Sequence, residues 1–424
     1  MQDLDQGPLE CGNIFRLFAA LLVEELQVQT GRSVSVEESA QWGPETRINE
    51  EGIGFDSLAR IDFAVKLNKY FHLHEVGAED YLLLKPTLGE WCEIIEHSLS
   101  IKSERITFHT SGSTGDPKPC THHISALAQE VEFLASLFPN RKRLVAFVPA
   151  HHIFGFLFTV LLPQKLKLDV VDARGWGPGV WPKKIVSGDL IIATPYLWDG
   201  LAKMCDTFPG DLIGVTSTAP MPADLKSALQ QKGLHNLFEI YGSSETAGVG
   251  YRTFDQTFYT LFPDWDRGNN ARSLIKTIDG DGPQTMTLND EITWHEGHEA
   301  DKGNYFQVGK RNDNAIQIGG VNVFPDRVKV CLNEHPSISE CVVRPMTRQG
   351  DEARKRLAAF IVLKEGCDDQ ELARRNITAY CQQHLSAPER PNHLTFGTQL
   401  PKNEFGKDID WLSVRQQSNE TLEF

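Results

Sequence analysis

The sequence predicts an α/β protein with a helical bundle first, then an α/β domain, then a small α+β domain. Three observations predict this order. Residues 10–98 carry apolar residues at helical spacing and show no strand pattern. Beyond residue 105, short β-type runs alternate with helical patterns, which favours a largely parallel sheet. Strand and helix signals resume beyond Asp313 in a separate group. We therefore expect domains at 10–98, 105–312 and 313–424.

The first domain is expected to be a small helical bundle. Its expected helices are Gly12–Val28, Asp56–Phe71 and Thr87–Leu99. A polar loop, Gln29–Gly54, joins the first two. The polar stretch Ser98–Arg105 is expected to link the bundle to the next domain.

The second domain is expected to alternate strands with helices. The expected strands are Leu144–Val148, Leu168–Val171, Leu190–Ala193, Gly214–Thr216 and Leu237–Ile240, and the helices are Ser125–Leu137 and Ala223–Gln231. The apolar run Ile153–Pro163 is too short to span a bilayer and is expected to be core. Residues 254–306 carry no clear pattern. In the third domain we expect strands at Ala315–Ile318, Glu340–Arg344 and Ala358–Leu363, and helices at Pro325–Asn333 and Asp368–His384.

The net charge of −15 is unevenly distributed along the chain. Residues 1–100 hold 18 acidic and 7 basic side chains, a balance of −11, so the remaining chain carries only −4. An acidic balance argues against nucleic acid as a partner. It favours a separate N-terminal unit that meets basic partners. The chain shows no signal-peptide pattern, and its eight cysteines lack metal-binding spacing, so we expect reduced thiols in a cytoplasmic protein.

The string Gly54-Phe55-Asp56-Ser57-Leu58 lies where the expected loop meets the second helix. Helix capping alone would be satisfied by either Asp56 or Ser57. The longer string GFDSLARIDFAVKLNKYF resembles acyl carrier proteins, in which the serine of GxDSL carries 4′-phosphopantetheine. The resemblance implies that Ser57 is modified by a phosphopantetheinyl transferase. It also implies delivery to a ketosynthase or another enzyme that uses carriers.

A second string forms a loop rich in glycine and hydroxyl residues. Its backbone N–H groups, hydroxyls and one lysine can share the charge of a phosphate. The residues concerned are Thr110, Ser111, Gly112, Ser113, Thr114, Gly115 and Lys118. A Walker A loop would need the lysine after a glycine, and Lys118 follows Pro117. A flexible linker is the other alternative, but β-type residues precede the loop and a helical pattern follows it.

This loop resembles the phosphate loop of adenylate-forming enzymes, which include acyl-CoA synthetases, adenylation domains of peptide synthetases and luciferases. Further strings resemble that family's motifs in the family's order. Pro149–Gly155 implies that His152 flanks the acyl pocket, with His151 as an extra histidine. Thr216–Pro220 implies that adenine lies beside Ser217, Thr218 and Ala219.

Tyr241-Gly242-Ser243-Ser244-Glu245-Thr246 resembles the family's YGxTE motif. The resemblance implies that Tyr241 and Gly242 lie near adenine and substrate, that the Ser244 hydroxyl contacts phosphate, and that Glu245 holds Mg²⁺. A carboxylate suits this hard cation. The family's ribose-binding Asp has no clear match, so Asp290 is the candidate and Asp301 the alternative.

The last motifs lie near the C-terminus. The resemblance implies that Arg311 contacts ribose or phosphate and that Asp313 is the pivot between the last two domains. Gly320, in GGVNVFP, would let pantetheine approach the backbone. Lys407, in PKNEFGK, would bridge the substrate carboxylate and the α-phosphate. Lys407, Glu245 and Ser244 are the expected catalytic residues.

The resemblance implies that ATP and Mg²⁺ activate a carboxylic acid as an acyl-adenylate, which a phosphopantetheine thiol then receives. That thiol could belong to the chain's own carrier. A subdomain that precedes the phosphate loop in full-length relatives is missing. Similar shortened chains with a GGVNVFP-like string occur among hydroxybenzoate-activating ligases of aryl polyene and xanthomonadin biosynthesis, which favours an aromatic acid. The alternatives are an acyl-CoA ligase that uses free CoA and a catalytically weak protein that presents the carrier.

Overall fold

The computed structural model describes residues 9, 11–32, 34–102, 105–110, 118–279, 282–295, 304–311, 315–319, 321–348, 351–367, 369–401 and 411. The chain divides into two compact units. The large unit comprises residues 1–110 and 118–310, and the small unit comprises 111–117 and 311–424. The boundary between the large unit and the C-terminal part of the small unit lies between residues 310 and 311. The sequence predicts this boundary between residues 312 and 313.

The N-terminal segment, residues 11–101, is helical wherever it is regular. Its helices are α1 (Cys11–Thr30), α2 (Val36–Ser39), α3 (Ser57–Phe71), η1 (Leu73–Val76), α4 (Tyr81–Leu84) and α5 (Leu88–Ile101). Asp56 caps α3 by accepting a 2.8 Å hydrogen bond from the Ala59 N–H. Thr87 and Glu90 form a capping box that begins α5. The short helix α2 lies within the expected polar loop, where Ser35 caps it.

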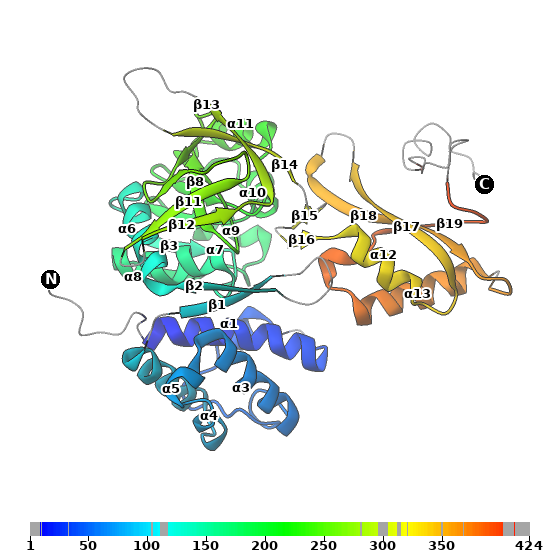
Figure 1. Ribbon diagram of the computed structural model, residues 1–424, viewed down its shortest axis with the longest axis horizontal. Helices are drawn as coiled ribbons and strands as arrows, with labels where there is room; N and C mark the ends of the chain where they lie inside the picture. The colour runs from blue at the N-terminus through cyan, green and yellow to red at the C-terminus, as the bar shows by residue number, and fades with distance from the viewer. Residues whose placement is uncertain are drawn as a thin grey trace. The chain divides into compact units, whose positions relative to one another are not determined.

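The N-terminal segment shares its hydrophobic core with the rest of the large unit. One continuous cluster of buried side chains runs from Leu9 to Phe306. Aromatic rings connect the N-terminal helices to the rest of this cluster. The ring centres of Tyr70, on α3, and Phe108 lie 5.5 Å apart, and those of Phe108 and Phe156 lie 5.3 Å apart. Helix α3 contacts β1 (Arg105–Thr110), the hairpin strand that contains Phe108, and Figure 1 shows the N-terminal helices on that side of the large unit. The expectation of a separate N-terminal unit is therefore corrected, because the apolar faces of these helices also bury side chains of the large unit.

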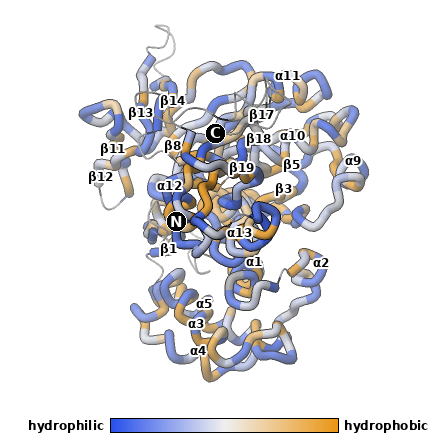
Figure 2. Tube along the Cα trace, turned by 90° about the vertical axis from the view of Figure 1, so that its right-hand side faces the viewer, coloured by the Kyte–Doolittle hydropathy of each residue, from blue (hydrophilic) through white to orange (hydrophobic). Residues whose placement is uncertain are grey.

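Hydropathy alone does not reveal this shared burial. Figure 2 shows hydrophilic and hydrophobic residues alternating along α3 and α5, as in any amphipathic helix. Such a pattern indicates a buried face but not the element that covers it.

Among the described residues, no helix has the length and apolar content needed to span a bilayer.

The hairpin is formed by β1 (Arg105–Thr110) and β2 (Lys118–His123), which pair antiparallel. The main sheet follows it, and within the described residues its strand order is β13-β14-β9-β8-β7-β6-β5-β3-β4. The bounds are β3 (Arg143–Ala146), β4 (Asp169–Asp172), β5 (Asp189–Ile192), β6 (Ile213–Thr216), β7 (Asn236–Ser243), β8 (Ala247–Arg252), β9 (Tyr259–Leu261), β13 (Asp290–His295) and β14 (Tyr305–Arg311). Strands β4, β3, β5, β6 and β7 run parallel to one another, as the sequence predicts, and β8 pairs antiparallel with β7.

Helices α6 (Ile124–Leu137), α10 (Pro195–Met204) and α11 (Ala223–Gln231) alternate with these strands. The apolar run at 153–163 forms α7 (Ile153–Phe156), η2 (Leu157–Leu161) and the start of α8 (Leu162–Leu166), and it is largely buried as expected. Two short helices, η3 (Pro178–Val180) and α9 (Trp181–Lys184), follow β4. The unpatterned region 254–306 contributes strands, including the separate sheet of β10 (Trp265–Arg267), β11 (Ser273–Ile278) and β12 (Gly282–Thr287).

The small unit has cores of its own. Its elements are β15 (Ile316–Ile318), β16 (Val321–Val323), α12 (Pro325–Asn333), β17 (Ile338–Arg348), β18 (Asp351–Leu363), α13 (Gln370–His384), η4 (Ala387–Glu389) and β19 (His393–Gly397). Strand β18 pairs antiparallel with β17 and parallel with β19. One face of this sheet buries a cluster with α12 and α13, and the other packs Phe360 against Trp411. The expected α+β character of this part is confirmed.

Candidate active site

The candidate site lies at the carboxyl ends of parallel strands in the large unit. Strand β3 leads into Pro149–His152, β6 leads into Ser217–Ala219, and β7 leads into Ser244 and Glu245. Because these strands run parallel within one sheet, their carboxyl ends meet at the same edge. Open α/β sheets bind ligands at that edge. The fold thus brings together three motifs that are far apart in the sequence.

The turn after β7 presents Glu245 to solvent. The Ser243 hydroxyl accepts hydrogen bonds from the Glu245 and Thr246 N–H groups, both at 3.2 Å. Gly242 is required beside this turn, because a Cβ at that position would lie 2.1 Å from the Ala247 carbonyl oxygen. The Glu245 carboxylate is therefore exposed on a turn that hydrogen bonds hold in place. An exposed, fixed carboxylate fits a ligand for a hard cation such as Mg²⁺.

Two buried residues without any motif hold this turn from behind. His122 of β2 lies 2.6 Å, through Nε2, from the Ser244 carbonyl oxygen. Burial lowers the pKa of His122, so its neutral ring donates that hydrogen bond. Glu130 of α6 accepts a 2.9 Å hydrogen bond from the Gly248 N–H. Neither residue is predicted from the sequence, because a histidine in a strand and a glutamate in a helix carry no local signal.

Glu130 belongs to a buried group of charges. Its Oε2 lies 3.5 Å from Nζ of Lys276, which in turn lies 3.7 Å from Oδ2 of Asp264. Burial raises the pKa of Glu130 to about 7 despite this lysine. Trp265 donates a 2.9 Å hydrogen bond to the Gly248 carbonyl, and the Lys276 ammonium lies 5.0 Å from the centre of its ring. The network fixes both backbone groups of Gly248.

The residues expected around the nucleoside come from β7, from the turn after β6 and from the start of β13. The Tyr241 hydroxyl donates a 3.0 Å hydrogen bond to Oδ2 of Asp290, at the start of β13. Ser217 is buried and donates to the Ile240 carbonyl at 2.9 Å. Thr218 has a φ of 78°, and its buried Oγ1 has no hydrogen-bond partner among the described residues. A β-branched residue is strained in that conformation, and such strain concentrates at functional sites.

Other expected residues lie elsewhere or outside the described part. His152 is exposed just after β3, whereas Lys118 is exposed at the start of β2. Ser57 is exposed at the start of α3. Arg311 ends β14, and Thr110 ends β1. The residues expected from motifs but outside the described range are Ser111, Gly112, Ser113, Thr114, Gly115, Asp301, Asp313, Gly320 and Lys407.

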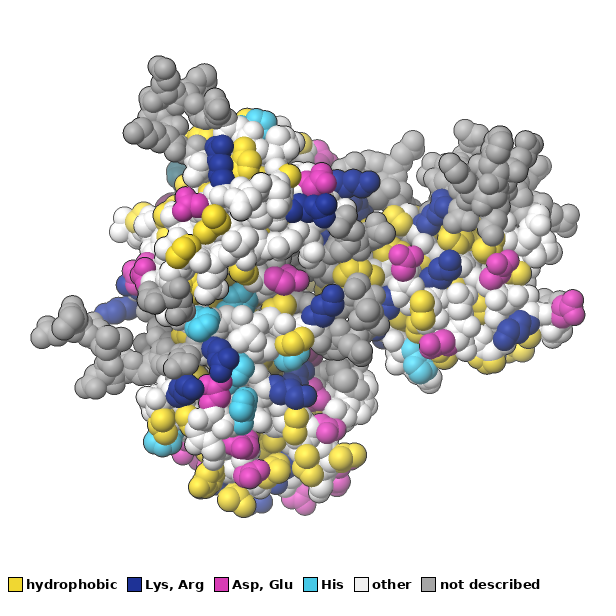
Figure 3. All heavy atoms as spheres, in the orientation of Figure 1, with side chains coloured by type: hydrophobic (Ala, Val, Ile, Leu, Met, Phe, Trp, Pro, Cys, Tyr) yellow, Lys and Arg dark blue, Asp and Glu magenta, His cyan; other side chains and the backbone are white. Residues whose placement is uncertain are grey.

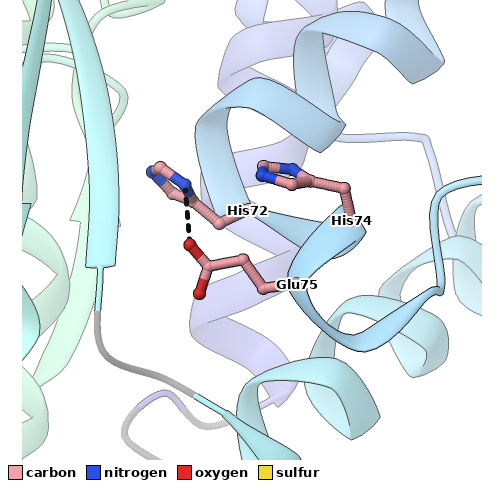
Figure 4. A group of neighbouring side chains, drawn as sticks. All are labelled: His72, His74 and Glu75. Carbon is pink, nitrogen blue, oxygen red and sulfur yellow. Dashed lines mark ion pairs between the residues drawn. The ribbon is translucent and has the colours of Figure 1, made fainter.

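His72, His74 and Glu75 form the cluster drawn in Figure 4, with ligand atoms within 4.8 Å of one another. Each already has a protein partner. Glu75 pairs with Arg105 and, at 3.2 Å, with Lys102. His72 contacts the Thr107 hydroxyl at 2.8 Å through Nε2. The cluster is therefore explained as a polar network that ties η1 to β1.

Comparisons with known proteins agree with this geometry. Residues 97–273 match the family model for the AMP-binding enzyme, and residues 328–407 match the one for the AMP-binding enzyme C-terminal domain. A 4-coumarate–CoA ligase of Halorhodospira halophila is 36% identical over 94% of this chain and 99% of its own length. A 4-coumarate–CoA ligase of Rhodobacter capsulatus is 38% identical over 93% and 99%, respectively.

Solved structures share the fold at low sequence identity. An amide bond synthetase from Marinactinospora thermotolerans superposes with a TM-score of 0.58 and 15% identity, covering 95% of this chain and 94% of that one. An o-succinylbenzoate CoA synthetase from Bacillus subtilis gives 0.57 and 18%, covering 75% and 70%. The sequence relatives, the two matched family models and the shared fold together show that this chain belongs to the AMP-binding enzymes and is an AMP-forming acid–thiol ligase.

Proposed function

We propose that this chain activates a hydroxyaryl carboxylic acid with ATP and transfers the acyl group to the thiol of free CoA. The similarity to chains named 4-coumarate–CoA ligase, which extends over almost the whole length of both partners, carries the proposal. That similarity covers most of the N-terminal segment too. It therefore favours the free-CoA alternative over transfer to a fused carrier, which the sequence analysis placed first.

The first half-reaction is a displacement at phosphorus. A carboxylate oxygen of the acid forms a bond to the α-phosphorus of ATP, the bond to the bridging oxygen breaks, and pyrophosphate leaves. Bound Mg²⁺ would offset the phosphate charge. Glu245 would hold that ion, with the loop at 110–118, Ser244 and Lys407 offsetting the remaining charge.

The nucleoside would lie against Tyr241, Gly242 and the Ser217–Ala219 turn. Asp290 is the proposed acceptor for a ribose hydroxyl, and its carboxylate is already oriented by the Tyr241 hydroxyl. Asp290 is favoured over Asp301 by that contact. Arg311 would add a positive charge toward ribose or phosphate.

In the second half-reaction the CoA thiol loses its proton and its sulfur forms a bond to the acyl carbon. The bond from that carbon to the phosphate oxygen breaks, and AMP leaves with the bonding electrons. We propose that the small unit turns about Asp313 between the two steps, so that Lys407 withdraws and Gly320 meets the pantetheine arm. Such a turn lets one site perform two reactions in sequence.

The test is pyrophosphate and AMP release with a panel of hydroxybenzoates, hydroxycinnamates and alkyl acids, with and without CoA. Glu245→Gln should lower kcat by about 100-fold to 1,000-fold, the usual effect of removing one group that stabilises developing charge. Glu132→Gln is the control, because Glu132 is an exposed carboxylate on α6 whose partner is Lys165. An unchanged rate in Glu245→Gln would overturn the assignment of the ion ligand. No turnover with any acid would overturn the function.

Ser57 favours a second candidate function, in which the chain loads its own phosphopantetheine. Ser57 is exposed at the first position of α3. Beside it, hydrophobic side chains gather on the surface over α3 and α4 (Figure 3), including Leu58, Ile61, Val65 and Leu84. Exposed apolar groups of this kind mark docking surfaces.

Intact-protein mass separates the two candidates. The chain is incubated with a phosphopantetheinyl transferase and CoA, and then with ATP and the acid. A carrier gains the phosphopantetheine mass and then the acyl mass, and Ser57→Ala loses both. A ligase for free CoA gains neither mass, and Ser57→Ala keeps full acyl-CoA formation.

A further inference from the structure

Two adjacent histidines follow β3, and they differ in their surroundings. The rings of His151 and His152 lie 4.3 Å apart. His151 is buried, and its Nδ1 has no hydrogen-bond partner among the described residues. His152 is exposed, yet desolvation by the surrounding protein lowers its pKa. His152 is therefore accessible to solvent, whereas the His151 ring that packs against it is buried.

The support behind His151 comes from the N-terminal segment. Oε1 of Glu24, on α1, lies 3.7 Å from Nε2 of His151. The other oxygen of Glu24 pairs at 2.8 Å with Lys66 of α3. The hydroxyl of Tyr70, also on α3, donates to the His151 carbonyl at 3.3 Å. Helix α1 thus contacts the ring of His151, and helix α3 contacts its backbone.

The pKa values of Glu24 and His151 indicate which of the two side chains carries a proton at neutral pH. Burial alone would raise the pKa of Glu24, but His151 and Lys66 outweigh it and hold the pKa at about 2. Burial, reinforced by His152, lowers the pKa of His151 to about 3 against the pull of Glu24. An ionised carboxylate therefore faces a neutral imidazole. Its negative charge favours the tautomer that carries the proton on Nε2.

We propose that Glu24, held by Lys66, is a positioning residue that fixes the tautomer and orientation of His151, and through it the placement of His152 against the bound acid. The inference rests on the proposed function for its kinetic consequence. The N-terminal segment then holds the histidines that lie beside the bound acid in position. No sequence motif in residues 10–98 predicts this role.

The chain offers a matched control one residue away. Glu25 lies on the same helix and pairs with the same Lys66, also at 2.8 Å, but its other contact is Gln29 and not a histidine. Glu24→Gln and Glu25→Gln each remove one carboxylate from Lys66. Only Glu24→Gln removes the charge that faces His151. A difference between them therefore reports on the histidine.

The kinetic experiment compares these variants in the full chain. Glu24→Gln should raise KM for the aryl acid by about 10-fold to 100-fold with KM for ATP unchanged, because a small misplacement at a site can cost on the order of 100-fold. Glu25→Gln should leave both values unchanged. The double variant Glu24→Gln/His151→Gln should match His151→Gln alone, since the two residues act in series. Equal KM values in the two single variants, or multiplicative effects in the double one, would overturn the proposal.

A second readout needs no turnover. Histidine-ring ¹⁵N shifts at pH 7 should show His151 protonated on Nε2 in the unmodified chain and in Glu25→Gln. Glu24→Gln should show a mixture of tautomers. An unchanged ring in Glu24→Gln would overturn the positioning role even if the chain proved inactive toward every acid.

Discussion

The N-terminal segment and the small C-terminal unit both look separable in the sequence, but only the small unit has a core of its own. Side chains of the N-terminal segment belong to one cluster that continues to Phe306. The clusters of the small unit draw all their residues from positions beyond 315. Amphipathic periodicity therefore identifies a buried face but leaves open which element covers it.

The largest expected effect comes from deletion. A chain that begins at residue 103 should fail to fold, because Phe108 loses the Tyr70 ring that packs against it and the rest of the shared cluster loses its N-terminal side chains. Marginal domains, stable by about 5–15 kcal/mol, rarely survive such exposure. The control is residues 1–310, which should unfold cooperatively in circular dichroism and resist limited proteolysis. A soluble, cooperatively folded chain of residues 103–424 would contradict the claim that the N-terminal segment shares its core with the large unit.

Substitution within the shared core should act on both of its parts together. Phe108→Ala is expected to cost about 3–5 kcal/mol, because Phe108 is almost fully buried. Urea unfolding followed at the N-terminal segment and at the main sheet should shift by the same amount.

Ile361→Ala is the control for Phe108→Ala, since Ile361 is fully buried in the small unit. It should shift only the transition of the small unit. If Phe108→Ala instead moved the N-terminal segment alone, the shared core would not be a cooperative one.

Acidification should weaken the junction of the N-terminal segment through His151. The unfolded chain protonates this histidine below its ordinary pKa of about 6.5, whereas burial holds the folded pKa at about 3. The unfolded state therefore binds more protons between these values, so stability falls as pH falls from 6.5 to 3. The contribution is a few kcal/mol at most, at about 1.4 kcal/mol per pKa unit.

The measurement compares the unmodified chain with His151→Gln across that pH range, so that contributions of groups away from His151 cancel, whereas that of Glu24, whose pKa His151 helps to lower, does not. Glu24, with its pKa of about 2, also loses stabilisation below its ordinary range, and Glu130, with its pKa of about 7, acts in the opposite direction. A difference between the two chains that does not depend on pH would contradict the burial of His151.

The smallest expected effect is that of Tyr70→Phe, which removes the hydroxyl that donates to the His151 carbonyl. A single hydrogen bond of this kind contributes about 0.5–1.5 kcal/mol. Thermal unfolding should show a shift of a few degrees at most. A larger loss would mean that the hydroxyl holds more of the junction than its single 3.3 Å contact indicates.

Local order was predictable because short-range rules govern it. Helix starts at Asp56 and Thr87 follow from capping, and the parallel strands follow from β-type runs between helices. Motif strings alone identify Tyr241, Ser217 and Glu245 as candidate site residues. His122, Glu130 and Glu24 could not be found in this way, because each acts on a partner more than a hundred residues away in the chain.

The sequence by itself determined the types of the elements, the order of the motifs and the family chemistry, since these depend on residue type and spacing. Tertiary structure alone decided that the N-terminal segment is part of the large unit and that its carboxylate faces a histidine of the candidate site. The physical reason is that burial and charge contacts depend on which faces meet in space, and one amphipathic helix can meet many partners.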